Sequence, residues 1–196
     1  MKKFSFVIAL LFGCFIGQVF AQETTWHFDK EHSKIQFKSV YMGIANVYGE
    51  FREYYGTINT NKKQFENARI NVNIKSKSIS TGIEMRDDHL KSEDFLYAEK
   101  YPEIKFECNS LTKVNDSIFK MDGNLTIRGI TKKETFDVKY KGMVQKDDEN
   151  RSAFTIIGTI NRFDYNVDWN EKFLRGFVVS KDLDIICDVL LVDDKK

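Results

Sequence analysis

The chain has 196 residues, of which 30 are lysine or arginine and 29 are aspartate or glutamate, giving a formal net charge of +1. Charges of both signs are interspersed along it, so it offers no basic patch for nucleic acid or for an anionic membrane surface. We therefore expect no nucleic-acid partner.

The first predicted element is a secretory signal peptide over residues 1–21. Lys2 and Lys3 precede an apolar run, and Ala21 completes a small-residue pattern that is typical of a cleavage site. The run is too short for a convincing transmembrane helix. We therefore expect cleavage after Ala21, no transmembrane segment in the mature chain, and a periplasmic or secreted protein.

The cysteines have different predicted roles. Cys14 ends a segment that resembles a lipoprotein signal, but the apolar run before it is short, so lipid attachment at Cys14 is the second choice behind cleavage after Ala21. Cys108 and Cys187 fall in phase with apolar neighbours. That phase favours two buried thiols, although export would also permit a disulfide.

Residues 22–196 are about the length of one domain, and most of them alternate between apolar and polar side chains with the period of a β-strand. In the clearest run, Val72 and Ile74 point one way while Asn71 and Asn73 point the other. Such runs cover residues 25–28, 34–40, 47–58, 68–78, 103–110, 118–121, 124–127, 134–143, 152–160 and 181–192. No long crossover helix separates them, so we expect an antiparallel sheet folded as a sandwich or a closed barrel. The alternation does not choose between the two.

Glycine and polar residues mark bends and connections between these runs. Gly49 and Gly56 fall inside the aromatic-rich run 47–58, where they suggest bends or β-bulges. Residues 128–131 and 146–150 are predicted to be turns.

Residues 81–102 are the one place where the alternation breaks off. Residues 84–90 and 92–100 have helix-compatible spacing, and Ser92 resembles the N-cap of the second segment. A helical interruption in a β chain must lie across an end of the sheet or plug it. We therefore predict that this segment caps one end of the fold and controls what enters.

The densest polar cluster is Arg86-Asp87-Asp88-His89. His89 could act as a general base oriented by Asp87 or Asp88, but no serine or cysteine nucleophile lies in a recognisable motif. We favour a structural role, in which Arg86 and the aspartates satisfy backbone groups at an irregular end of the sheet.

The histidines do not have the spacing of a metal site. They are His27, His32 and His89, and no HxH or HExxH motif is present. We expect no metal, and we predict that His32-Ser33 forms a turn between the first two strands.

Four motifs, in order along the chain, resemble the YceI-like family. They are Trp26-x-Phe28-Asp29-x-x-His32-Ser33, Arg86-Asp87-x-His89-Leu90, Gly123-x-Leu125-Thr126-Ile127-Arg128-Gly129 and Ile160-Asn161-Arg162-Phe163. The resemblance implies an all-β fold, an extended lipocalin-like antiparallel β-barrel with an apolar internal pore, whose end the short helical segment would cap. It also implies a single domain over residues 22–196. Dimers are usual in the family, so a homodimer is one expected assembly.

The resemblance further implies a binding protein and not an enzyme. Its pore would bind a long-chain amphiphilic lipid, a polyisoprenoid or similar molecule such as an isoprenoid quinone or a prenyl phosphate, for carriage, storage or sensing outside the cytoplasm. No cofactor other than this isoprenoid-type lipid is expected. Two alternatives stay open: a secreted hydrolase or isomerase that acts on a lipid with Asp87 and His89 as acid–base groups, and an interaction module whose barrel is fully packed.

The phase of the alternation selects the side chains that would line the pore. They are Ile35, Phe37, Val72, Ile74, Phe106, Leu125, Phe136, Val138, Phe154, Ile156 and Ile185. A polar head group should remain at a mouth of the pore, and Arg86, His89 and Arg162 are the candidates for holding it by hydrogen bonding or charge.

Overall fold

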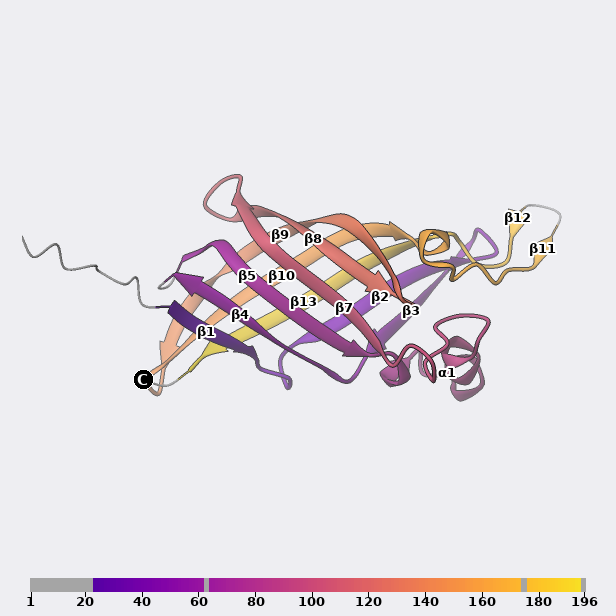
Figure 1. Ribbon diagram of the computed structural model, residues 1–196, viewed down its shortest axis with the longest axis horizontal. Coiled ribbons are helices and arrows are strands. Elements are labelled where there is room, and N and C mark those ends of the chain that lie inside the picture. Colours follow the sequence, from indigo (N-terminus) through magenta and orange to yellow (C-terminus); the bar gives the residue numbers. More distant parts are fainter. Residues whose placement is uncertain (1–22, 62–63, 174–175, 195–196) are drawn as a thin grey trace, which may run out of the picture.

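The computed structural model describes residues 23–61, 64–173 and 176–194, and its strands wrap into an elongated barrel (Figure 1). The predicted signal peptide and Cys14 lie outside the described residues. In chain order the elements are β1 (Glu23–Phe28), β2 (Lys34–Tyr41), β3 (Ala45–Phe51), β4 (Tyr54–Asn61), β5 (Gln64–Lys75), η1 (Ser76–Ser78), β6 (Ile79–Ser80), α1 (Glu84–Lys91), β7 (Glu103–Lys113), β8 (Ile118–Ile127), β9 (Ile130–Lys146), β10 (Glu149–Asn161), η2 (Arg162–Tyr165), β11 (Lys172–Phe173), β12 (Gly176–Phe177) and β13 (Asp182–Asp193).

The barrel closes because β13 pairs on both of its edges. The order β1-β4-β5-β7-β8-β9-β10-β13 returns to β1, where Trp26 lies opposite Asp193 and Phe28 lies opposite Leu191. Each of these pairings is antiparallel. The predicted all-β, antiparallel barrel is therefore confirmed, and the sandwich is excluded. An eight-stranded barrel has an interior just wide enough to be filled by side chains or to hold one small ligand.

At three places in the barrel wall, two strands that follow one another in the sequence lie end to end: β1 with β2, β3 with β4, and β5 with β6. β2 follows β1 along the same edge of β13, and β3 pairs with β2 as β4 pairs with β1. β6 follows β5 after the short 3-10 helix η1 and pairs with β3. The predicted strands 47–58 and 68–78 are each interrupted in the structure, the first between β3 and β4 and the second between β5 and β6. The two interruptions lie side by side, because Arg52 N–H donates to the Ser78 carbonyl and Lys75 N–H donates to the Glu53 carbonyl.

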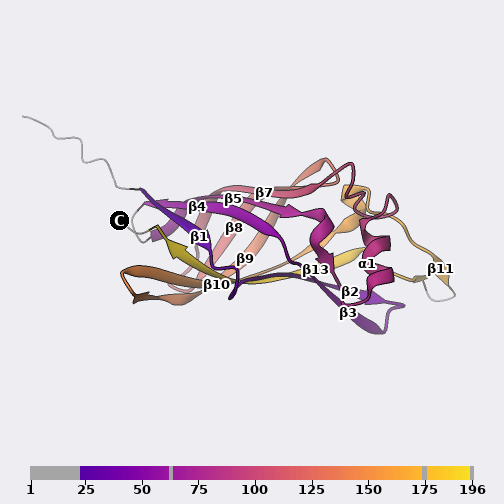
Figure 2. The ribbon, with the colours of Figure 1, turned by 90° about the horizontal axis from the view of Figure 1, so that it is seen from below.

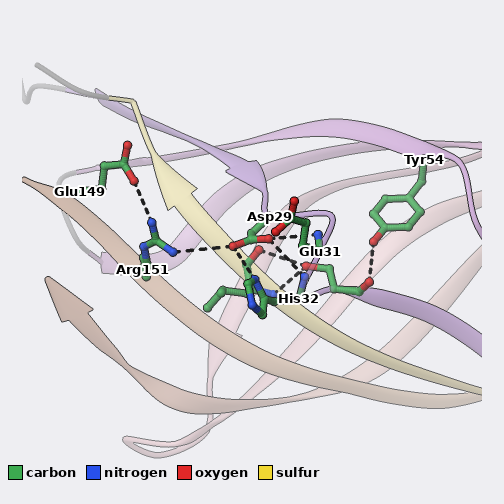
Figure 3. A network of polar contacts seen from close by, with 8 residues as sticks. Asp29, Glu31, His32, Tyr54, Glu149 and Arg151 are labelled. Atoms are coloured by element: carbon green, nitrogen blue, oxygen red, sulfur yellow. Dashed lines mark hydrogen bonds and ion pairs between the residues drawn. The ribbon is translucent and has the colours of Figure 1, made fainter. Parts of the chain in front are cut away.

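A polar network fixes the turn between β1 and β2 (Figure 3). Asp29 Oδ1 accepts from the backbone N–H groups of Glu31 and His32 at 3.1 and 3.2 Å, and Asp29 Oδ2 lies 2.9 Å from His32 Nδ1. The Tyr54 hydroxyl donates to the Ser33 carbonyl at 2.9 Å. Burial acts to raise the pKa of Asp29, but the hydrogen bonds from His32 outweigh it and hold that pKa below its ordinary value. The predicted turn at His32-Ser33 is confirmed.

Both predicted hairpin turns are also present. Arg128 and Gly129 join β8 to β9, and Asp147 and Asp148 join β9 to β10. All four residues have positive φ, at 50°, 75°, 54° and 64° in that order. Left-handed backbone at both central positions is typical of the tight turns that match the twist of a hairpin.

The predicted bulges at Gly49 and Gly56 are wrong. The register shifts lie between Asn59 and Asn61 in β4, and elsewhere in β7 and β10, whereas pairing is continuous at both glycines. At Gly56 a Cβ would run into the Asn71 carbonyl oxygen. This glycine is explained by the close approach of β4 to β5.

Of the two helical segments predicted within residues 81–102, only the first is present. α1 (Glu84–Lys91) matches the prediction, but residues 92–100 form successive turns. Ser92 is the C-cap of α1, and its Oγ donates to the His89 carbonyl at 2.8 Å. Tyr97 has a φ of 47°, which a right-handed helix cannot contain. Ser92 therefore ends a helix instead of starting one.

The two ends of the barrel differ. α1 and the β11–β12 hairpin lie at one end, while the start of β1 and the end of β13 lie at the other (Figures 1 and 2). The expectation that the helical segment caps an end of the barrel is confirmed.

Candidate functional site

A cavity of about 550 Å³ lies inside the barrel. Its wall is hydrocarbon almost throughout, built from aliphatic and aromatic side chains of every strand in the closed ring. All eleven side chains that the alternation selected for a pore are part of this wall. The interior is therefore hollow, which removes the physical basis for a fully packed interaction module.

Glycines keep part of this interior open. Phe37, Phe106 and Phe136 all line the cavity, and each ring covers an inward-facing glycine, at residues 49, 123 and 158 respectively. At each glycine a Cβ would lie well inside van der Waals distance of the ring. Since the ring occupies the space of the missing side chain, it lies against the barrel wall and leaves the middle of the barrel free.

The cavity is closed at the end of the barrel away from α1. Phe65 and Phe154 line it there and are 6% and 4% exposed. Their ring centroids lie 4.7 Å apart, edge to face. Trp26, which is fully buried, lies behind Phe65 with centroids 5.0 Å apart.

The other end of the cavity, beside α1, reaches solvent. Tyr41, at the end of β2, is 45% exposed, and Arg86 and His89 on α1 are half-buried. All three contribute to the cavity lining. We call this end the mouth.

Arg162, at the start of η2, is the most deeply buried charge at the mouth and is only 2% exposed. Its Nε donates to the Ser180 carbonyl at 2.8 Å and its Nη2 to the Val179 carbonyl at 3.2 Å. Its Nη1 donates to the carbonyls of Val167 and Trp169 at 2.5 and 3.1 Å. Four of the five N–H groups of a guanidinium are thereby used to tie the mouth segments together, and one N–H of Nη2 remains.

Burial lowers the pKa of Arg162 to about 10, and the negative charge of Asp168 acts in the opposite direction. Within the part of the chain that the structure describes, neither Arg162 nor Arg86 has an ion-pair partner. The mouth of an apolar cavity therefore carries two positive charges that no carboxylate neutralises at close range.

Arg86 and Asp87 both bind Thr81, which lies just after β6. Arg86 Nε donates to Thr81 Oγ1 at 2.7 Å, and Asp87 Oδ1 accepts from Thr81 N at 2.7 Å and from Thr81 Oγ1 at 2.5 Å. Burial acts to raise the pKa of Asp87, but the hydrogen bonds from Thr81 outweigh it and keep that pKa below its ordinary value. These contacts are the structural role favoured above, because they anchor α1 to the barrel.

His89 is held by different partners. Its Nε2 lies 3.0 Å from Asp94 Oδ2, and its ring packs edge to face against Phe95 and Trp169, with centroid distances of 5.0 and 4.9 Å. Asp87 is directed to Thr81, so it does not orient the His89 imidazole as a general base, which was one form of the catalytic interpretation.

The strand pattern did not select several side chains at the mouth. Phe95 and Trp169 line the cavity, and their rings lie 5.2 Å apart. They come from irregular segments, where no alternation marks an inward face. Their apolar character among charged neighbours was the only available signal.

Other predicted features lie within the described residues. Cys108 and Cys187 are buried thiols, and no disulfide joins them, which confirms the favoured interpretation. Burial raises the pKa of Cys187 to about 12. Among the described residues, no three His, Cys, Asp or Glu side chains are grouped so that they could hold a metal ion. Within the same ranges no helix has the length and apolarity to cross a membrane.

Residues 26–191 match the YceI-like domain family. The UPF0312 protein SA2479 of Staphylococcus aureus (strain N315) is 33% identical over 158 residues, which are 80% of this chain and 90% of that protein. The crystal structure of a Campylobacter jejuni YCEI protein superposes with a TM-score of 0.68 at 28% identity, covering 80% of this chain and 90% of that one. A polyisoprenoid binding domain from Saccharophagus degradans shares the fold, with a TM-score of 0.60 at 15% identity over 87% of this chain and 98% of that domain.

Proposed function

The chain belongs to the YceI-like family, and we propose that it holds the hydrocarbon chain of an amphiphilic lipid inside its barrel. The ligand class is a polyisoprenoid or similar molecule, such as an isoprenoid quinone or a prenyl phosphate. The polyisoprenoid-binding domain that shares the fold supports this class.

The observation that carries the proposal is the hollow, hydrocarbon-lined interior. A long alkyl or isoprenoid chain that leaves water is stabilised by about 0.8 kcal/mol per buried methylene. Such a chain needs no polar partner along its length, and the cavity wall presents almost none. The fit between cavity and ligand is thus one of shape and hydrophobicity.

The polar head of the ligand stays at the mouth, near Arg86, His89 and Arg162. The two arginines have no ion-pair partner among the described residues, and one Nη2 N–H of Arg162 is unused by the carbonyls around it. A phosphate, carboxylate or quinone oxygen placed there would accept hydrogen bonds from positively charged donors.

We infer that the protein carries, stores or senses this lipid outside the cytoplasm and does not transform it. The predicted signal peptide supports the location, and the separate partners of Asp87 and His89 support a binding role over catalysis. A homodimer remains a prediction.

Organic extraction of the purified, full-length protein, followed by lipid mass spectrometry, tests the proposal. We expect one class of isoprenoid-type or similar single-chain lipid in near-stoichiometric amount. A matched protein of similar size, purified through the same steps from the same cells, controls for membrane lipid carried along. An extract that contains only the control's background would contradict the proposal.

A further inference from the structure

Four aromatic side chains close the inner end of the cavity. Phe65 from β5 packs against Trp26 from β1, Tyr140 from β9 and Phe154 from β10, at centroid distances of 5.0, 6.3 and 4.7 Å. Tyr140 and Phe154 also lie 5.3 Å apart. We call these four residues the aromatic stop. Because they come from four different strands, the stop belongs to the barrel framework and not to a loop.

The stop is held firmly in place. Trp26 is fully buried, and its Nε1 donates to Thr60 Oγ1 at 3.0 Å, so the one polar group of the ring is satisfied. The Trp26 backbone pairs with Ile58 of β4 on one side and with Asp193 of β13 on the other. Moving Trp26 would therefore break the strand pairing that closes the barrel, and Phe65 packs against this fixed ring.

The volume in front of the stop limits the length of a bound chain. An apolar protein cavity of about 150 Å³ binds benzene, which has six carbons, so by the same ratio a cavity of about 550 Å³ holds roughly 22 carbon atoms. A prenyl chain of four isoprene units is close to this size. A chain twice as long would extend from the mouth into water.

We propose that the aromatic stop sets the chain length of the ligand, and that the cavity selects amphiphiles with a single chain of about four isoprene units or an alkyl chain of similar size. This inference rests on the proposed function. A ligand enters chain first from the mouth, and its far end meets Phe65 and Phe154. Each unit up to this length is buried, and further units remain in solvent.

A competition among prenols tests the proposal. Protein stripped of lipid is incubated with equimolar farnesol, geranylgeraniol and solanesol, which have 15, 20 and 45 carbons, presented in the same detergent micelles. The retained prenols are then extracted and quantified. We expect geranylgeraniol to be retained at least tenfold over farnesol, and solanesol to show no further gain.

Three variants test whether the aromatic stop is what limits the length of the bound chain. Phe65→Ala removes a ring from the stop, so the preferred length should increase by about one isoprene unit, tested with the 25-carbon prenol. Ile58→Phe fills space beside the stop and should return the preference to farnesol, even if Phe65→Ala fails to fold. Phe37→Ala removes the same kind of side chain from the half of the barrel near the mouth, and it should change the retention of all lengths together.

The outcomes separate the two proposals. Retention that keeps rising to solanesol, or an equal shift in Phe65→Ala and Phe37→Ala, would overturn the stop and leave lipid binding intact. Failure of the wild-type protein to retain any prenol or any other single-chain lipid would overturn the proposed function and the stop with it.

Discussion

The phenyl ring of Phe136 on β9 fills the space that a side chain at Gly158 on β10 would need. Phe136 lines the cavity, and Gly158 faces inward between Ile156 and Ile160. The ring therefore lies against the wall of the barrel, and the same arrangement recurs at Gly49 and Gly123. The hollow depends on these small residues as much as on the large ones.

Replacing Gly158 by Ala should push the Phe136 ring into the cavity. We expect the free energy of unfolding to fall by about 1–3 kcal/mol, as for other overpacked cores, and lipid retention to fall at least tenfold. Adding Phe136→Leu should restore retention, because a smaller side chain can share the space with the methyl group of the introduced alanine. Denaturant unfolding and lipid extraction are measured for Gly158→Ala, for Phe136→Leu and for the double variant, which together form a double-mutant cycle. Additive losses would show that the two residues are not coupled.

A charge on the cavity wall should prevent binding. Val72 lies opposite Gly56 and Phe106, and its side chain lines the cavity. In Val72→Asp, a lipid chain would have to desolvate a carboxylate without a partner, which costs several kcal/mol. We expect bound lipid to fall at least tenfold while the barrel still forms. Asn71→Asp, on the exposed face of the same strand, is the matched control and should retain its lipid. Full lipid retention in a folded Val72→Asp protein would remove Val72 from the binding wall.

Arg162 should matter more for stability than for affinity. Lysine keeps the charge but lacks the planar set of donors that binds four carbonyls here. We expect Arg162→Lys to lower the free energy of unfolding by about 3 kcal/mol, which for a chain of this length is roughly 6–12 °C in Tm. Arg52→Lys, at a side chain that is 66% exposed, should leave Tm unchanged. An unchanged Tm together with lost lipid would instead assign Arg162 to the head group.

The lowered pKa of Asp87 predicts that the free energy of unfolding decreases at acid pH. Its pKa is held below 3.8 in the folded protein, chiefly because hydrogen bonds from Thr81 outweigh the effect of burial. A depressed carboxyl pKa stabilises the fold above the unfolded pKa, and that contribution is lost as pH falls through the folded pKa. Asp87→Asn should therefore be less stable than wild type at pH 7, by about 1.5–3 kcal/mol. The gap should narrow as the pH falls below 3.8, which urea unfolding at several pH values would measure. A gap that is constant with pH would contradict the assignment.

Alternation was sufficient to predict most strands and the inward face of each, because one side of every barrel strand is apolar. It could not distinguish a barrel from a sandwich, since both bury one face, and the resemblance to the family made that choice. The strand breaks at Arg52–Glu53 and after Lys75 were missed. They depend on hydrogen bonds between distant segments of the chain that no local pattern records.

The mouth was the least predictable part of the site. Phe95 and Trp169 enter the cavity lining from irregular segments that distant arginines hold: Arg128 donates to the Phe95 carbonyl and Arg162 to the Trp169 carbonyl. The cavity volume was equally inaccessible from the sequence, because it depends on how the rings of Phe37, Phe106 and Phe136 lie against glycines on neighbouring strands.

Native mass spectrometry of the lipid-free protein titrated with geranylgeraniol tests the central claim most directly. The hollow barrel predicts a saturable complex of one prenol per chain in the wild type, and its loss in Val72→Asp. No complex with the prenol or any other single-chain lipid, or the same uptake by both proteins, would contradict it.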